Sequence, residues 1–274
     1  MFKKMTATLA AVAVGTCAVL VAGFLWSGGA SAVTVKAVAG AEGGTSARVE
    51  VPILMYHYVD EAPPENGPAA PSLTISPQQF EAEMDYLAGN GFHPVTIADV
   101  YAATQGTAEL PAKPVAITFD DGGADCYSVA YPILREHGFT ATFFVITGYV
   151  GNGSCMTWDQ LREMRAAGMD IESHTYSHPD LRKLDAARLA QELRESRAAL
   201  VRELGASACF LSYPEGRFDG RVVAAAKAAG YLAAVRTRSL WGPLASDSRY
   251  EWQRTNIKPG MSLPAFAKAL EPAR

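Results

Sequence analysis

The chain lacks the features that mark nucleic-acid-binding, disordered or disulfide-rich proteins. Its 274 residues carry 24 Lys and Arg against 28 Asp and Glu, which gives a formal net charge of −4 and a pI near 5.8. This balance does not provide the basic surface that binding to nucleic acid or to an anionic membrane requires. With 49% hydrophobic and 19% charged residues, we expect an ordered chain that buries a large core.

Cysteine is scarce, and its spacing fits no cysteine-based zinc motif. Cys17 lies in the N-terminal apolar run, which leaves Cys126, Cys155 and Cys209 for the rest of the chain. An oxidising compartment would permit one disulfide among these three and leave one thiol over. Two interpretations stay open: three small buried hydrophobic residues, or a Cys126–Cys155 bridge.

A long uncharged apolar run occurs at the N-terminus, from Thr6 to Trp26, after two lysines. It reaches the ~20 residues that span a bilayer, and Ala30-Ser31-Ala32 follows with the small-x-small pattern of signal-peptidase sites. Residues 1–32 are therefore interpreted as a signal peptide, which we favour, or as an uncleaved membrane anchor. Both interpretations predict an exported protein. The Gly-rich residues 33–50 are predicted to form a flexible linker before a single domain, 51–274.

From residue 51 onward, short apolar strands alternate with amphipathic helices. Residues 76–79 (SPQQ) combine a helix N-cap, a proline at the first helical position and a capping-box glutamine, and residues 157–160 (TWDQ) form a second capping box. Residues 185–204 predict a long amphipathic helix, while 115–119 (VAITF) is typical of a buried strand. Repeated βα units predict an α/β fold with a parallel sheet, and short apolar strands favour a distorted or incomplete (β/α) barrel.

The strand at 115–119 ends in two adjacent carboxylates, Asp120 and Asp121, which are costly at a buried position unless they are used. His174 and His178 follow another predicted strand at a spacing that places both imidazoles on one side. Either motif alone is more often structural, but both lie at strand ends, where barrel active sites form. Together, Asp121 and the two histidines predict a two-histidine, one-carboxylate metal site, with Asp120 as the base for a metal-activated water.

The motifs "TFDDG" and "SHTYSH" resemble those of the polysaccharide deacetylases of carbohydrate esterase family 4, the NodB-type domain, and the resemblance extends over about residues 51–270. It implies a distorted (β/α) barrel that holds one divalent metal on Asp121, His174 and His178, with Asp120 as general base. It also implies removal of N-acetyl groups from N-acetylglucosamine polymers, or of O-acetyl groups from xylan. Zinc is favoured for the metal over cobalt, nickel, manganese or iron.

The third motif of that family is altered in "LSYPEG", residues 211–216. An arginine normally precedes the proline, but none stands before Pro214, and Glu215 replaces the usual aromatic residue. The resemblance still implies that Tyr213 and Pro214 line the site and that the backbone N–H of Glu215 helps to bind the oxyanion. The carboxylate of Glu215 is a new feature that could repel or reposition substrate.

No histidine follows position 178, where the family commonly places a catalytic one. The stretch "PILMYHYVD" resembles the opening of a circularly permuted branch that includes exported poly-N-acetylglucosamine deacetylases. This resemblance implies that His57 is the general acid for the leaving amine, the alternative being a structural histidine. Arg254 resembles a late arginine of that branch and is a candidate to orient Asp120, or else forms a surface ion pair. Trp241, in a Gly/Pro/Ser-rich loop, is a candidate for contact with a sugar or acetyl group.

Three functions remain open from the sequence. The first is an exported, metal-dependent deacetylase of an acetylated amino-sugar polysaccharide of a cell wall or biofilm. The second is an O-acetyl esterase or small-molecule amidohydrolase with the same metal site, and the third is a glycan-binding relic with weak catalysis. None of them involves nucleic acid or an inferred protein partner, and a membrane enters only through an uncleaved N-terminal segment.

Overall fold

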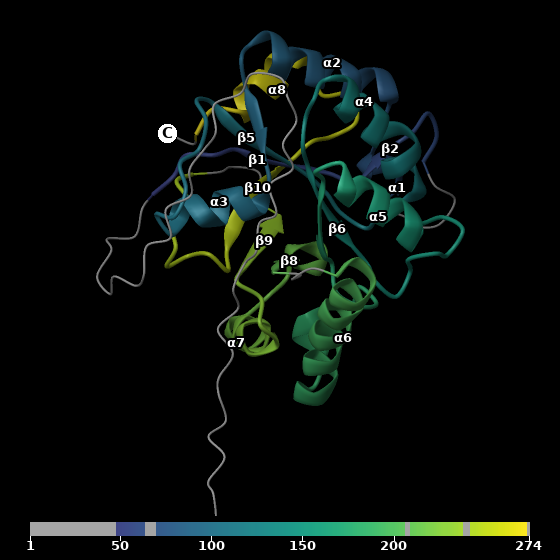
Figure 1. The fold of residues 1–274 in the computed structure, drawn as a ribbon, viewed down its shortest axis with the longest axis vertical. Helices are drawn as coiled ribbons and strands as arrows, with labels where there is room; N and C mark the ends of the chain where they lie inside the picture. The colour runs from purple at the N-terminus through teal and green to yellow at the C-terminus, as the bar shows by residue number, and fades with distance from the viewer. Residues whose placement is uncertain (1–47, 64–69, 206–208, 238–241, 273–274) are drawn as a thin grey trace, which may run out of the picture. The chain divides into compact units, whose positions relative to one another are not determined.

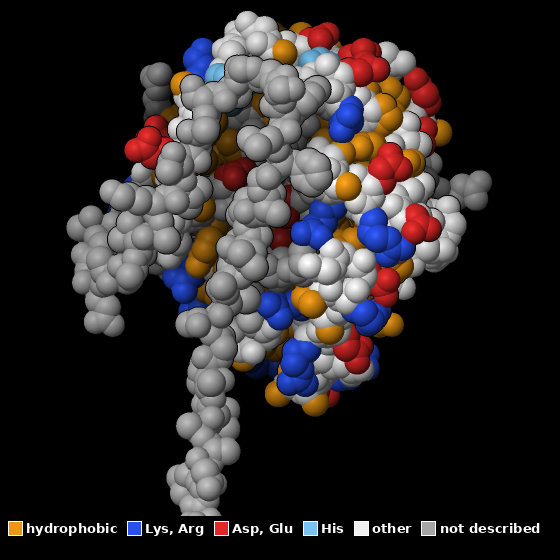
Figure 2. Space-filling view, viewed as in Figure 1, with side chains coloured by type: hydrophobic (Ala, Val, Ile, Leu, Met, Phe, Trp, Pro, Cys, Tyr) orange, Lys and Arg blue, Asp and Glu red, His pale blue; other side chains and the backbone are white. Residues whose placement is uncertain are grey.

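The computed structural model describes residues 48–63, 70–205, 209–237 and 242–272. The predicted signal peptide or anchor, nearly all of the predicted linker and Trp241 lie outside the described residues. Within the described part of the chain, no helix is both long enough and apolar enough to cross a membrane. On the face that Figure 2 shows, basic and acidic side chains are interspersed, as the small net charge leads one to expect.

A parallel β-barrel forms the centre of the fold (Figure 1). Seven of the eight strands of the main sheet close into this barrel. Closure occurs because the first strand pairs with the last strand and also with the strand that ends just before the aspartate pair. In spatial order, the barrel strands are β1 (Ile53–Tyr56), β10 (Trp252–Asn256), β9 (Ala233–Thr237), β8 (Phe210–Ser212), β7 (Asp170–Ser173), β6 (Thr142–Val145) and β5 (Pro114–Phe119).

The barrel is distorted at one edge of β5. The outer strand β4 (His93–Val95) pairs with the first half of β5, and β6 pairs with Thr118 and Phe119 on the same edge. A separate two-stranded sheet joins β2 (Tyr58–Val59) to β3 (Thr74–Ile75). The prediction of a distorted (β/α) barrel is thus confirmed.

Helices connect the strands outside the barrel (Figure 1). They are α1 (Ala70–Leu73), α2 (Pro77–Gly89), α3 (Ile97–Thr104), α4 (Tyr131–Glu136), α5 (Trp158–Ala166), α6 (Ala186–Leu204), α7 (Gly220–Ala229) and α8 (Leu263–Ala269). The capping box predicted for α5 is present, since Thr157 and Gln160 exchange side-chain and backbone hydrogen bonds.

The capping box predicted for α2 is only half formed. Ser76 accepts a hydrogen bond from the backbone N–H of Gln79 at 3.1 Å, as predicted. The Gln79 side chain does not return to Ser76, however: its amide donates to the carbonyl of Lys258 at 3.0 Å and accepts from the N–H of Gly260 at 2.8 Å. A tertiary contact with the loop after β10 has therefore replaced the local one.

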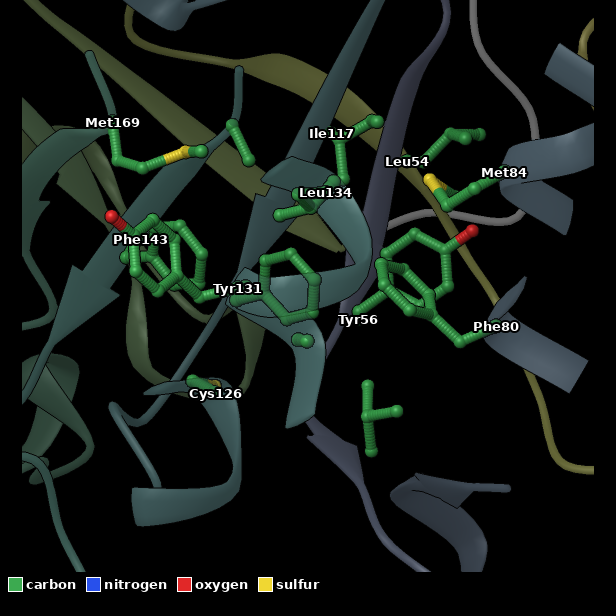
Figure 3. Close-up of a cluster of buried hydrophobic side chains, with 14 of the residues drawn as sticks. Leu54, Tyr56, Phe80, Met84, Ile117, Cys126, Tyr131, Leu134, Phe143 and Met169 are labelled. Atoms are coloured by element: carbon green, nitrogen blue, oxygen red, sulfur yellow. The ribbon is translucent and has the colours of Figure 1, made fainter. Parts of the chain in front are cut away.

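Alternation along the strands divides the core into an inner and an outer part. Ile53, Ala116, Phe144 and Trp252 come from four barrel strands and share one buried cluster, which fills the barrel interior. The chain neighbours of Ile53, Ala116 and Phe144 include members of a second cluster between the strands and the helices. Figure 3 shows this outer cluster, whose labelled side chains include Leu54, Ile117 and Phe143 from strands and Phe80, Met84 and Leu134 from helices.

Cys126 and Cys155 are both free thiols in the structure, so the alternative of a Cys126–Cys155 bridge is not observed. Cys126 is fully buried in the outer cluster, with its thiol 3.6 Å from the carbonyl oxygen of His57. Cys126 therefore packs as a small hydrophobic residue next to the active-site end of β1.

Candidate active site

Three potential metal ligands meet at the C-terminal ends of β5 and β7. The ligand atoms of Asp121, His174 and His178 all lie within 4.8 Å of one another. Nε2 of His174 lies 3.5 Å from Oδ1 of Asp121, and Nε2 of His178 lies 3.7 Å from the same oxygen. Ligands bound at about 2.1 Å to a tetrahedral ion are roughly 3.4 Å apart, so these side chains fit a single ion with little movement.

Neighbouring groups orient two of these ligands. Nδ1–H of His174 donates to the carbonyl oxygen of Ser212 at 2.9 Å, which leaves Nε2 as the free, metal-binding nitrogen. The hydroxyl of Tyr58 donates to Oδ2 of Asp121 at 2.9 Å, which leaves Oδ1 facing the histidines. Burial and the charge of Asp121 raise the pKa of Tyr58, so its hydroxyl stays protonated. Sequence reasoning missed Tyr58 and Ser212, because neither belongs to a ligand motif.

The backbone is strained where the site is assembled. Asp121 (φ 70°), Thr175 (φ 68°), His178 (φ 58°) and Glu215 (φ 55°) are four of the five described non-glycine residues with positive φ. Such a conformation costs roughly 1–2 kcal/mol for an ordinary residue. Its concentration in the loops after β5, β7 and β8 indicates that the positions of these side chains are functionally constrained.

Asp120 is held by a buried arginine. The Arg254 guanidinium, 0% exposed, donates to both carboxylate oxygens of Asp120, at 2.7 and 2.5 Å. It also donates to the hydroxyls of Ser212 and Thr118, at 2.8 and 3.1 Å. Burial alone would raise the pKa of Asp120, but the Arg254 charge holds this pKa well below its usual range. Asp120 is therefore ionised, and the alternative of a surface ion pair for Arg254 is excluded.

His57 lies beside Asp120 at the same end of the barrel. Tyr56 pairs with Phe119 in the parallel register, and the N–H of Asp120 donates to the Tyr56 carbonyl at 3.0 Å, so the next residues of both strands are neighbours. Nδ1 of His57 is buried and has no hydrogen-bond partner among the described residues. Burial lowers the pKa of His57, and the charges of Asp120 and Asp121 oppose this effect. His57 therefore lies next to Asp120 with one ring nitrogen that no described residue binds.

The third-motif residues Tyr213 and Pro214 are fully or nearly fully buried. The Tyr213 ring stacks on Phe218, with ring centroids 4.7 Å apart, and its buried hydroxyl has no partner within the described chain. Pro214 begins a 3-10 turn that ends at Gly216. The structure thus places Tyr213 in the packing between barrel and helices, beneath the turn that presents the next residue.

The carboxylate of Glu215 is paired rather than free. It lies 2.5 Å from Nη1 of Arg217, and the same nitrogen is 3.5 Å from Oδ2 of Asp180, two residues after His178. The Glu215 side chain is 52% exposed, so this ion pair contributes little stability. It does neutralise the negative charge that the altered motif would otherwise bring to the site.

Comparison with known proteins agrees with this geometry. The family described as polysaccharide deacetylase matches residues 107–234. YxkH of Bacillus subtilis (strain 168), whose name provisionally assigns it to the polysaccharide deacetylases, is 32% identical over 228 residues, or 83% of this chain and 78% of that protein. The poly-β-1,6-N-acetyl-D-glucosamine N-deacetylase of Staphylococcus aureus (strain MRSA252) is 30% identical over 148 residues, which are 52% of this chain and 49% of that protein. The chain thus spans about half the length of that relative.

A solved structure shares both fold and sequence features. The Streptococcus pyogenes deacetylase PplD, in complex with acetate, superposes with a TM-score of 0.74 at 30% identity, covering 82% of this chain and 100% of that chain. The family match includes the aspartate pair, His174 and His178, whereas His57 and Arg254 lie outside its range.

Proposed function

This chain belongs to the polysaccharide deacetylase family, and from that premise we propose that it is an exported, metal-dependent deacetylase. Its substrate would be an N-acetylglucosamine-containing polysaccharide of a cell wall or biofilm, and its products the free amine and acetate. The proposal is carried by the cluster of Asp121, His174 and His178 beside an ionised Asp120. The name of the S. aureus relative and the acetate bound to PplD support it. The sequence of residues 1–32 supports export.

The donor set fits a divalent metal ion. A carboxylate and two imidazoles suit zinc first, and also cobalt, nickel, manganese or iron. The fit is favoured by the Nδ1–H···O bond that fixes the tautomer of His174 and by the Tyr58 hydroxyl that orients Asp121. When bound, such an ion would polarise the acetamide carbonyl and lower the pKa of a water molecule.

The residues of the chain divide the remaining chemistry among them. Asp120 accepts the proton of the water whose oxygen forms a bond to the acetyl carbon, and Arg254 holds the carboxylate in one orientation. The backbone N–H of Glu215 is the candidate donor to the oxyanion. His57 gives a proton to the nitrogen as the C–N bond breaks; a pKa lowered by burial makes its protonated form a stronger acid. The position of His57 also supports membership in the branch with the N-terminal MYH motif.

Acetate release from N-acetylglucosamine oligomers tests this proposal. We expect release by the purified protein, loss of release after chelation, and recovery when zinc, cobalt or manganese is added back. Asp120→Asn should lower turnover at least ~100-fold, the lower range for a general base, while the protein still binds one metal equivalent. Release that survives chelation, or full activity of the Asp120→Asn variant, would contradict the mechanism. Acetate from O-acetylated xylan alone would assign the chain to the esterases instead.

A further inference from the structure

A cavity of about 350 Å³ lies directly beside the metal ligands, between the loops that follow β5, β6 and β7. Asp121 and His178 form part of its wall, so it is continuous with the place where the acetyl group must react. Asp120, His57 and Glu215 do not line it. The cavity therefore extends away from the catalytic base and is large enough for a sugar unit. Its other polar lining side chains are those of Tyr58, Tyr149, Asn152, Ser154 and Ser177.

One wall of the cavity carries an exposed aromatic ring. Tyr149, in the loop after β6, lines the cavity and is 42% exposed, one of the few large hydrophobic side chains that the described residues expose. Its hydroxyl donates to the carbonyl oxygen of Ser177 at 3.4 Å. The N–H of Gly148 donates to the carbonyl oxygen of Tyr176 at 2.8 Å, and a Cβ on Gly148 would lie 2.5 Å from that oxygen. These contacts join the two loops and hold the ring at the rim.

The cavity offers no positive side chain. No Lys or Arg is among its described lining residues, whose ionisable groups are the ligands Asp121 and His178, Tyr58, Tyr149 and the thiol of Cys155. An aromatic face with amide and hydroxyl groups suits the C–H faces and hydroxyls of an uncharged sugar. Away from the wall formed by Asp121 and His178, a carboxylate or phosphate on the bound unit would lose water without gaining a cationic side chain as partner, which is costly.

We infer that this cavity binds the sugar unit adjacent to the one that is deacetylated, and that it selects an uncharged unit over one with a carboxylate or phosphate. The inference rests on the proposed function and narrows its substrate class. It favours a homopolymer of N-acetylglucosamine over a wall glycan in which N-acetylglucosamine alternates with an acidic sugar. Tyr149 is the platform for the adjacent unit, and the absence of Lys and Arg from the described lining residues sets the charge preference.

Binding in the absence of turnover tests the inference separately from catalysis. The full-length, metal-loaded Asp120→Asn protein would be titrated by calorimetry with an N-acetylglucosamine tetramer and with a tetramer of alternating N-acetylglucosamine and N-acetylmuramic acid. We expect the neutral tetramer to bind at least ~10-fold more tightly, a difference of about 1.4 kcal/mol. Tyr149→Ala should weaken binding of the neutral tetramer ~10-fold, within the range of an aromatic contact, and Tyr149→Phe should not.

Two further variants complete the design. Tyr127→Ala removes a tyrosine outside the cavity, whose hydroxyl donates to Glu163, and should leave both affinities unchanged. Asn152→Lys places a cation in the cavity and should shift the preference toward the acidic tetramer even if Tyr149→Ala does not fold. Equal affinity for both tetramers, or no effect of Tyr149→Ala and Asn152→Lys, would overturn the subsite. Selective binding without acetate release by the wild-type protein would support the subsite and contradict only the proposed deacetylation.

Discussion

At the scale of single residues, the notable feature is that Arg254 of β10 donates to both carboxylate oxygens of Asp120, although the third motif lacks an arginine. The pair of Arg254 and Asp120 spans 134 positions in sequence and is fully desolvated. Desolvating both charges is expensive, so the arrangement is stable only with good geometry and further hydrogen bonds. Two bonds to the carboxylate and two more to Ser212 and Thr118 meet that condition.

Arg254→Lys should distinguish the effect of the positive charge at this position from the effect of the two-pronged guanidinium geometry. Lysine keeps the positive charge but has no planar fork, so it cannot hold both oxygens of Asp120 at once. We expect kcat to fall roughly 10–100-fold, the part of a general-base effect that depends on orientation, with KM and bound metal almost unchanged. Steady-state kinetics with metal analysis would measure this. If KM rises while kcat is unaffected, Arg254 contributes to substrate binding and does not position the base.

The metal ligands could be predicted from the sequence, whereas their partners could not. Asp121, His174 and His178 follow short apolar strands, and in a parallel barrel those strand ends meet at one edge. The Tyr58 hydroxyl contacts Asp121 and the Ser212 carbonyl contacts His174 because of how neighbouring strands are aligned. Which hydroxyl or carbonyl reaches the site depends on which residues of two strands lie side by side. A single sequence does not contain that register. The prediction of a role for Tyr213 in lining the site stays untested.

At the scale of elements, the turn after β8 depends on one glycine. Gly216 has φ 67°, and a Cβ there would lie 2.7 Å from the backbone nitrogen of Thr237 in β9. The turn therefore packs against the neighbouring strand so closely that no side chain fits. Because Glu215 and Gly216 are adjacent in the turn, this contact also fixes the position of the Glu215 N–H relative to the site.

Gly216→Ala should displace this turn and affect both stability and activity. The positive φ and the backbone clash together should lower the free energy of unfolding by roughly 1–3 kcal/mol, and kcat/KM should fall because the oxyanion donor moves. Gly106→Ala is the matched control, since Gly106 has a similar φ of 69° but a Cβ there meets nothing within 4 Å. Thermal unfolding and acetate release would measure the two effects. Wild-type behaviour of Gly216→Ala would show that the turn is free to move.

Element boundaries were predictable where local signals agree with tertiary packing. α5 follows its capping box, and α6 (Ala186–Leu204) matches the helix predicted over 185–204, with Asp185 as its N-cap and Gly205 as its C-cap. β10 was not predicted, because its Trp252, Arg254 and Asn256 face the crowded barrel interior and mix aromatic, charged and polar types. The polar residues that β10 supplies to the site interrupt the apolar pattern by which a buried strand is recognised.

At the scale of the whole molecule, stability should depend on buried carboxyl groups far from one another. Burial raises the pKa of Glu83 to about 7, of Asp125 to about 6 and of Asp170 to about 7. Each carboxyl is more easily protonated in the folded chain than in the unfolded chain. At these three positions the folded state thus binds more protons between the ordinary pKa near 4 and the raised values, so their contribution to the free energy of unfolding should fall as the pH rises from about 5 to 8.

Glu83→Gln isolates one of these groups. Glu83 lies on α2, where its carboxylate accepts hydrogen bonds from the Tyr56 hydroxyl and the Gln79 amide, both at 2.8 Å. A pKa raised from 4.5 to about 7 corresponds to a cost on the order of 3 kcal/mol for ionising it in the folded state. The variant cannot ionise, so we expect it to be slightly less stable than wild type at pH 5, where it loses a hydrogen bond, and more stable at pH 8.

Chemical unfolding across this range would measure the change, with the exposed Glu81→Gln on the same helix as control. If Glu83→Gln and Glu81→Gln both retain the wild-type slope, Glu83 is already ionised in the folded protein and the pH dependence arises from Asp125 and Asp170.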